Sequence, residues 1–267
     1  MSENILYPLL LSLFAGLATL IGFFITLFAK RTNTKLLSFS LGLSAGVMVY
    51  ISFVELLQEA FIRLKDVYGD KIGSFYAVLW FFGGMLVIAI IDRLVPSFEN
   101  PHEIHSVEEL SDGTKIDPKL KKTGVMMALA IGIHNFPEGM VTFMSSMENI
   151  SLGIAIAFAI AIHNIPEGIA VSVPVYYATG SRKKAFIMTF VSGIAEPIGA
   201  LVAYFILMPF LSSVLLGCVF AFIAGIMVFI SFDELFPAAK AYGQHHLAIY
   251  GLISGMLIMA FSLILLV

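Results

Sequence analysis

Eight long apolar stretches occupy most of the chain, and they restrict it to an all-α integral membrane protein. About 20 consecutive apolar residues suffice for a helix to cross a bilayer, where the helix satisfies its own backbone hydrogen bonds. The stretches cover roughly residues 6–29, 36–58, 74–95, 123–147, 151–178, 185–208, 213–237 and 246–266. We therefore predict one transmembrane domain, residues 1–267, with eight spans numbered in this order.

Composition agrees with this architecture and excludes other classes of protein. The chain is 59% hydrophobic and 12% charged, whereas a soluble domain is about half apolar and about a quarter charged. A net charge of −3 lacks the basic excess that a phosphate-binding surface needs, so nucleic acid is excluded as a partner. The single cysteine, Cys218, cannot form an internal disulfide or a thiolate cluster.

The basic residues predict the orientation of the chain in the membrane. Cytoplasmic loops carry an excess of Lys and Arg, and twelve of the fifteen lie on one face, together with the long polar loop 96–122. We therefore predict a multi-pass protein of the cell (inner, cytoplasmic) membrane with this loop in the cytosol and both termini extracytosolic. The N-terminus lacks the basic segment and early cleavage site of a signal peptide, so the first span is expected to be retained.

A repeated segment predicts internal symmetry. Residues 45–56 (AGVMVYISFVEL) match residues 224–235 (AGIMVFISFDEL) at nine of twelve positions. They lie in spans 2 and 7, which cross the membrane in opposite directions, so spans 1–3 and 6–8 are predicted to form an inverted repeat around spans 4 and 5. This 3+2+3 arrangement is typical of secondary transporters. Two similar lipid-facing helices are the alternative, but the shared glutamate argues against it.

Spans 4 to 6 carry ionisable residues that need a partner or a function. Residues 134–139 read HNFPEG, residues 163–168 read HNIPEG, and Glu196 precedes a proline in span 6. A charged side chain in mid-membrane costs at least about 2.5–3.5 kcal/mol. Every Lys and Arg lies in a loop or at the end of a span, so protons, the two histidines or a bound metal remain to neutralise the glutamates.

Spacing favours the metal. Within each motif the histidine and glutamate are four residues apart and share one helical face, and a hairpin of spans 4 and 5 places both motifs at similar depth. The predicted ligands are His134, Asn135, Glu138, His163, Asn164, Glu167 and Glu196. Imidazole, carboxylate and amide donors suit Zn²⁺, Fe²⁺, Mn²⁺ and Co²⁺ and disfavour Cu⁺.

Other polar side chains are weaker candidates for a metal pathway. They are Met48, Ser52 and Glu55 on span 2, Asp233 and Glu234 on span 7, and His102 and His105 in the loop. Plain core packing is the alternative for Met48. The two span-7 acids could equally be interfacial side chains, and the loop histidines could be solvated without binding metal.

The paired motifs, with the Glu-Pro of span 6 and the eight spans, resemble the ZIP family of divalent-metal transporters, and within it the bacterial ZupT-like branch. The resemblance covers essentially the whole chain. It implies a binuclear mid-membrane site in which His134, Glu138, His163 and Glu167 surround one metal, and Asn135, Glu138, Asn164, Glu167 and Glu196 the other. It also implies Met48 as a span-2 ligand. Some members carry an acid where this chain has Asn164 and an amide where it has His163.

We therefore expect import of a divalent transition metal into the cytosol, the direction being implied by the resemblance. We expect zinc as the main substrate and iron, manganese, cobalt and cadmium as further substrates. No prosthetic group is expected, and the question of a homodimer is left open. The metal is expected to leave past Asp233, Glu234 and the loop histidines as spans 1–3 and 6–8 rock against spans 4 and 5.

Two other classes of function stay open at this point. One is a metal-dependent intramembrane enzyme, although the chain has no HExxH motif and no nucleophile stands out beside the cluster. The other is a membrane-embedded metal sensor or scaffold, which would leave the inverted repeat unexplained.

Overall fold

The structure, a computed structural model, is all-helical in the part of the chain that it describes. This part comprises residues 5–28, 34–94, 132, 135–210, 212–242 and 245–266, and no β-strand occurs in it. The α-helices are α1 (Leu6–Phe28), α2 (Thr34–Ile51), α3 (Leu57–Tyr68), α4 (Asp70–Leu94), α7 (Ile150–Thr179), α8 (Arg182–Val202), α9 (Ser213–Ile230), α10 (Phe236–Tyr242) and α11 (His245–Leu266). Short π or 3-10 segments are η1 (Ser52–Leu56), η2 (Ala203–Leu207), η3 (Met208–Phe210) and η4 (Ser231–Leu235).

The helices match a protein that crosses the membrane many times. Seven helical segments of the described ranges are long and apolar enough to span a bilayer. Residues 135–148 form a further helix, which belongs to the fourth predicted span. The earlier part of that span and the loop 96–122 lie outside the described residues. The predicted all-α membrane fold is confirmed.

The helix of the second span continues ten residues beyond its predicted end. It runs through α2, η1 and α3 to Tyr68, because residues 57–68 are amphipathic and bury Ala60 and Leu64 against the protein. Hydropathy alone missed this extension, since its other faces are polar. Gly69 ends the helix with a positive φ of 77°, which favours glycine.

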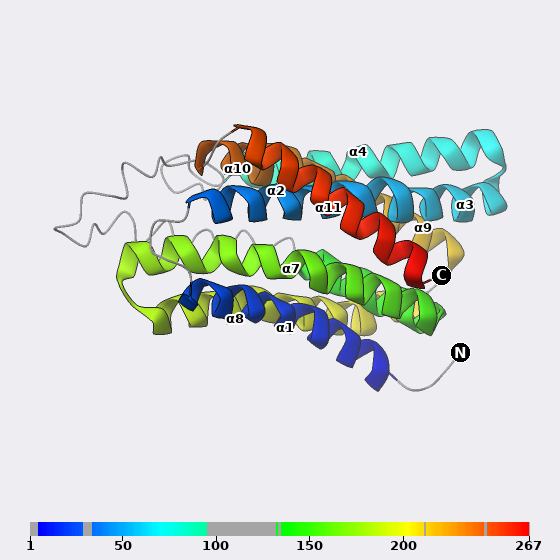
Figure 1. Cartoon of the computed structure of the whole chain (residues 1–267). Helices are drawn as coiled ribbons and strands as arrows, with labels where there is room; N and C mark the ends of the chain where they lie inside the picture. Colours follow the sequence, from blue (N-terminus) through cyan, green and yellow to red (C-terminus); the bar gives the residue numbers. More distant parts are fainter. Residues whose placement is uncertain are drawn as a thin grey trace.

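The helices pack as two bundles, seen as two layers in Figure 1. The hairpin bundle contains α1, residues 135–148, α7 and α8, and the repeat bundle contains α2, α3, α4, α9, α10 and α11. The most extensive packing lies within the bundles, α1 on α7 and α2 on α11. Among the numbered helices, the contacts between the bundles are mainly those of α2 and α11 with α7. Spans 1 and 6 thus pack with spans 4 and 5, so the packing units differ from the repeat units.

The two copies of the repeat share backbone geometry as well as sequence. In each copy the α-helix changes to a π-helical turn at the SFxEL segment. Ser52 Oγ donates to Met48 O at 2.6 Å, and Ser231 Oγ donates to Met227 O at 2.7 Å. Because equivalent residues of the two copies make the same turn, the repeat in sequence is also a repeat in structure.

Glycine contacts place these copies in equivalent surroundings. A Cβ atom on Gly46 would collide with Leu252 O of α11, and one on Gly225 would collide with Phe81 O of α4. Gly46 and Gly225 are equivalent residues of the repeat. The pair α2 and α11 therefore corresponds to the pair α9 and α4, as an inverted repeat of spans 1–3 and 6–8 requires.

The same symmetry relates α1 to α8. Gly16 and Gly193 each lie against the other's backbone carbonyl, which indicates that the pseudo-two-fold axis passes close to them. Residues 16–22 (GLATLIG) correspond to residues 193–199 (GIAEPIG) with four of seven positions identical.

Spans 4 and 5 follow the symmetry too. Gly139 packs on Glu196 O of α8, and Gly168 packs on Thr19 O of α1. These glycines are equivalent residues of the two HNxPEG motifs. Thr19 is therefore the symmetry counterpart of Glu196.

Two adjacent glycines of α4 test this packing. A Cβ on Gly84 would collide with Phe222 O, whereas a Cβ on Gly83 would meet nothing within 4 Å. We expect Gly84→Ala to destabilise the protein by about 1–3 kcal/mol, because the backbone must shift, and Gly83→Ala to leave stability unchanged or slightly raised. Thermal unfolding of both variants in detergent measures the difference. Equal melting temperatures would contradict the close helix contact.

Candidate metal centre

A one-residue turn joins the two helices that carry the motifs. The helix of residues 135–148 and α7 are separated only by Asn149, whose Oδ1 accepts a hydrogen bond from Ser151 N at 2.9 Å. An asparagine in this role is a favoured helix N-cap. The resulting antiparallel hairpin brings Glu138 and His163, which lie 11 and 14 residues from Asn149, to similar depth.

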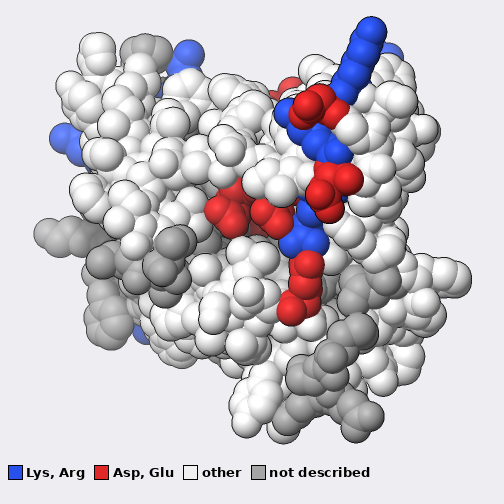
Figure 2. Space-filling view, turned by 90° about the vertical axis from the view of Figure 1, so that its right-hand side faces the viewer, with Lys and Arg blue, Asp and Glu red and all other residues white. Residues whose placement is uncertain are grey.

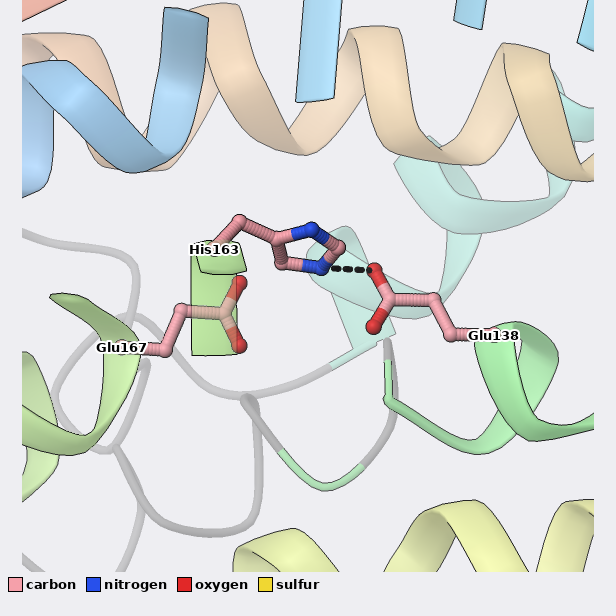
Figure 3. Close-up of side chains that lie close together, drawn as sticks. All are labelled: Glu138, His163 and Glu167. Carbon is pink, nitrogen blue, oxygen red and sulfur yellow. Dashed lines mark ion pairs between the residues drawn. The ribbon is translucent and has the colours of Figure 1, made fainter. Parts of the chain in front are cut away.

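Three ionisable side chains converge inside the hairpin bundle. Donor atoms of Glu138, His163 and Glu167 all lie within 4.8 Å of one another. His163 Nε2 is 3.1 Å from Glu138 Oε1, and Figure 3 shows the two carboxylates on either side of the imidazole. The residues are 1%, 0% and 0% exposed. This spacing fits three ligands of one cation.

Asn164 connects a third carboxylate to this cluster. Its Nδ2 donates to Ala15 O of α1 at 2.9 Å and to Glu196 Oε1 of α8. Glu196 is fully buried, and Asn164, which contacts it, directly follows His163 in the sequence. All four helices of the hairpin bundle thus contribute to the centre, since α1 holds Asn164 and α8 provides Glu196.

Asn135 repeats the arrangement of Asn164 through the symmetry. Its Nδ2 donates to Ser192 O at 3.4 Å, and Ser192 is the counterpart of Ala15. Both asparagine side chains are fully buried. Each amide is therefore held by a backbone carbonyl of the facing helix.

Several oxygens of the centre lack a hydrogen-bond donor within the described residues. They are Glu138 Oε2, Asn164 Oδ1 and Glu196 Oε2. A buried polar atom without a partner costs about 1–3 kcal/mol, so a cation bound by these acceptors would stabilise the protein. The nitrogen and oxygen donors match those of a divalent transition metal.

Known proteins with similar sequences identify the family. The family described as ZIP zinc transporter matches residues 4–118 and 98–263 of the chain. The chain belongs to the ZIP family. Similar proteins named zinc transporter ZupT include the following three. The one from Oceanobacillus iheyensis is 57% identical over 266 residues, 99% of each chain. Those from Nitratidesulfovibrio vulgaris and Streptococcus mutans are 54% and 55% identical, over 98% and 99% of each chain.

The ZIP ligand set expected from sequence is only partly within the described residues. Five of its members meet around the centre, through the cluster of Glu138, His163 and Glu167 and the contact of Asn164 with Glu196. Asn135 is buried on the same hairpin. His134 lies outside the described residues, so the binuclear arrangement stays a prediction.

Span 2 reaches the centre through a residue that sequence reasoning missed. Ser44 Oγ of α2 donates to Glu167 Oε1 at 3.4 Å, so this face of α2 looks onto the centre from the repeat bundle. Met48 lies one turn further along α2 and is fully buried, and its ligand role stays a prediction. Ser52 Oγ donates to the Met48 carbonyl, so the Ser52 hydroxyl has a hydrogen-bond partner without a metal. The four-residue spacing of Ser44, Met48 and Ser52 was the available signal.

The remaining candidates lie away from the cluster or outside the described residues. Glu55 is partly exposed in η1, and in η4 Asp233 is exposed and Glu234 partly so. Neither segment contributes to the three-residue group around His163. The loop residues His102 and His105 are outside the described residues, so their roles also stay predictions.

Zinc binding by the purified protein tests the centre. We expect Glu138→Gln to lower the affinity at least about tenfold, because it removes a charged ligand, and loss of ligand-shell contacts alone costs 10–100-fold. Glu59→Gln, the same change on α3 away from the cluster, serves as the matched control and should bind as the wild type does. Titration calorimetry gives both affinities. Equal affinities for the two variants would contradict the assignment of Glu138.

Proposed function

We propose that the protein imports Zn²⁺ across the cell membrane into the cytosol. The observation that carries this proposal is the buried group of Glu138, His163 and Glu167 with Asn164 and Glu196 beside it. A permanently bound structural ion would need only a closed cage, but this centre adjoins the seam between two helical bundles, where Ser44 meets Glu167. The names of the ZIP relatives support zinc as the substrate.

The two bundles are the parts that move in this proposal. All five polar residues of the centre belong to the hairpin bundle, whereas α2 touches it from the repeat bundle. Moving the hairpin bundle against the repeat bundle would carry the site intact from one side of the membrane to the other. This division replaces the rocking of spans 1–3 and 6–8 against spans 4 and 5, because spans 1 and 6 pack with the hairpin.

Orientation follows from the distribution of basic residues. The beginning of α1, the turn between α3 and α4, and the end of α11 lie at one end of the molecule (Figure 1). This is the end with few basic residues, so we take it as the outer end, with both termini extracytosolic. Glu55 then lies towards the outer end, and Asp233 and Glu234 lie towards the cytosol, where they would receive the released metal.

An intramembrane enzyme is the second candidate function. A buried carboxylate and imidazole could also hold a catalytic metal, with water as the nucleophile. Membership in a transporter family and the inverted repeat favour transport. The two functions differ in whether the metal crosses the membrane.

Zinc flux into proteoliposomes decides between them. We expect the wild type to fill vesicles with zinc and Glu138→Ala or Glu167→Ala to abolish the flux, because each removes a carboxylate of the centre. Glu59→Ala should transport at the wild-type rate. Wild-type flux that survives in both site variants would overturn the site, and the absence of wild-type flux would favour the enzyme.

Competition among metals tests the substrate class. We expect Fe²⁺, Mn²⁺, Co²⁺ and Cd²⁺ in excess to reduce zinc uptake, because they accept nitrogen and oxygen ligands. Mg²⁺ and Ca²⁺ should have no effect, since both require a larger set of oxygen ligands or retained water. Inhibition by Mg²⁺ equal to that by Co²⁺ would show that the imidazole contributes nothing to selection.

A further inference from the structure

Arg63 joins the two bundles at the outer end. It lies on α3 of the repeat bundle, and its Nη1 is 2.6 Å from Oε1 of Glu148, the last residue of the helix 135–148 in the hairpin bundle. Its Nη2 is 2.6 Å from Glu59 Oε1, one turn back on α3. One guanidinium therefore holds a carboxylate of each bundle.

The surroundings of Arg63 shield one partner of this ion pair from water. Exposed pairs contribute little because water screens them; Glu148 is 36% exposed, but the Arg63 side chain is only 11% exposed. Its Cζ lies 5.5 Å from the ring centre of Phe220 on α9, within the range of a cation–π contact. Figure 2 shows this end of the molecule, where charged side chains form a row and acidic groups gather beside a basic one.

The inverted repeat gives the ion pair a further meaning. In the proposed movement the hairpin bundle rocks against the repeat bundle, so the outer and inner ends open in alternation. A contact present equally at both ends stabilises both states and leaves their populations unchanged. The positions equivalent to Arg63 and Glu148 are Tyr242 and Tyr177, which cannot form such an ion pair. The ion pair is therefore not repeated at the equivalent positions of the inner end.

We propose that the Arg63–Glu148 ion pair is a latch that holds the outer ends of the two bundles together and shifts the equilibrium towards the state closed to the outside. Opening towards external metal requires this pair to separate. The latch sets the fraction of transporters that are ready to take up metal, without touching the metal. It rests on the proposed orientation and function, but it concerns a different part of the molecule.

Kinetics of zinc uptake by whole cells test the latch. Glu148→Gln removes the bridge between the bundles, while Glu59→Gln removes an Arg63 contact within α3 and the same negative charge from the same face. Because apparent affinity scales with the fraction of the binding-competent state, we expect Glu148→Gln to lower the KM for external zinc about threefold or more. Glu59→Gln should leave it near the wild-type value. Loss of external negative charge alone would raise KM in both variants.

A double variant separates the bridge from a general effect of Arg63. Arg63→Gln should lower KM as Glu148→Gln does, and the two changes together should lower it no further, because they break one interaction. Additive changes, or equal shifts in Glu148→Gln and Glu59→Gln, would overturn the latch.

Hydrogen exchange of the purified protein gives a readout that does not depend on transport. We expect backbone amides of residues 145–153 to exchange faster in Glu148→Gln than in the wild type, and at the wild-type rate in Glu59→Gln. Unchanged exchange in Glu148→Gln would overturn the latch. If the wild type carried no zinc, the proposed function would fail, and exchange alone would still decide whether Arg63 ties the bundles together.

Discussion

Three carboxylates buried in the middle of an apolar helical bundle form the constraint on which the rest of this structure depends. Glu138, Glu167 and Glu196 are at most 1% exposed, and no Lys or Arg of the sequence lies in the middle of spans 4 to 6. A charge in such surroundings must be compensated locally. The fold provides amide and imidazole groups from adjacent residues of the motifs, and it leaves acceptor oxygens for a cation.

Close helix packing makes that arrangement possible. Glycines let α8 and α1 approach the hairpin until backbone touches backbone, at Gly139 against Glu196 O and Gly168 against Thr19 O. Only at this distance can the short side chain of Asn164 reach both Ala15 O and Glu196. The glycine of each HNxPEG motif therefore lets the facing helix, α8 or α1, come close enough to contact the metal centre, although the glycine has no side chain of its own.

Much of this could be predicted from the sequence, because long apolar runs and a repeated six-residue motif are strong signals. The membrane fold and the convergence of Glu138, His163 and Glu167 belong to that part. The division into two bundles could not be predicted, since hydropathy shows which helices face lipid but not which helices pair. Ser44 was missed because a single serine in a span is usually explained by local packing. The counterpart of Glu196 in α1 was missed because the seven-residue match is short and its central residue, Thr19, is not acidic.

Departures from the symmetry mark where the two halves perform different tasks. A symmetric carrier would hold its cargo equally well in both states, but the centre is asymmetric: Glu196 faces it from α8, and its counterpart on α1 is Thr19, whose hydroxyl donates to Gly16 O at 2.7 Å. Ser44, which reaches Glu167 from α2, corresponds to the buried Ile223 on α9. The polar contact that Ser44 makes with the site is therefore not repeated at the equivalent position on the other side of the pseudo-two-fold axis. A ligand that meets different walls in the two states binds them with different affinity, and that difference shifts the loaded protein towards one of the two states.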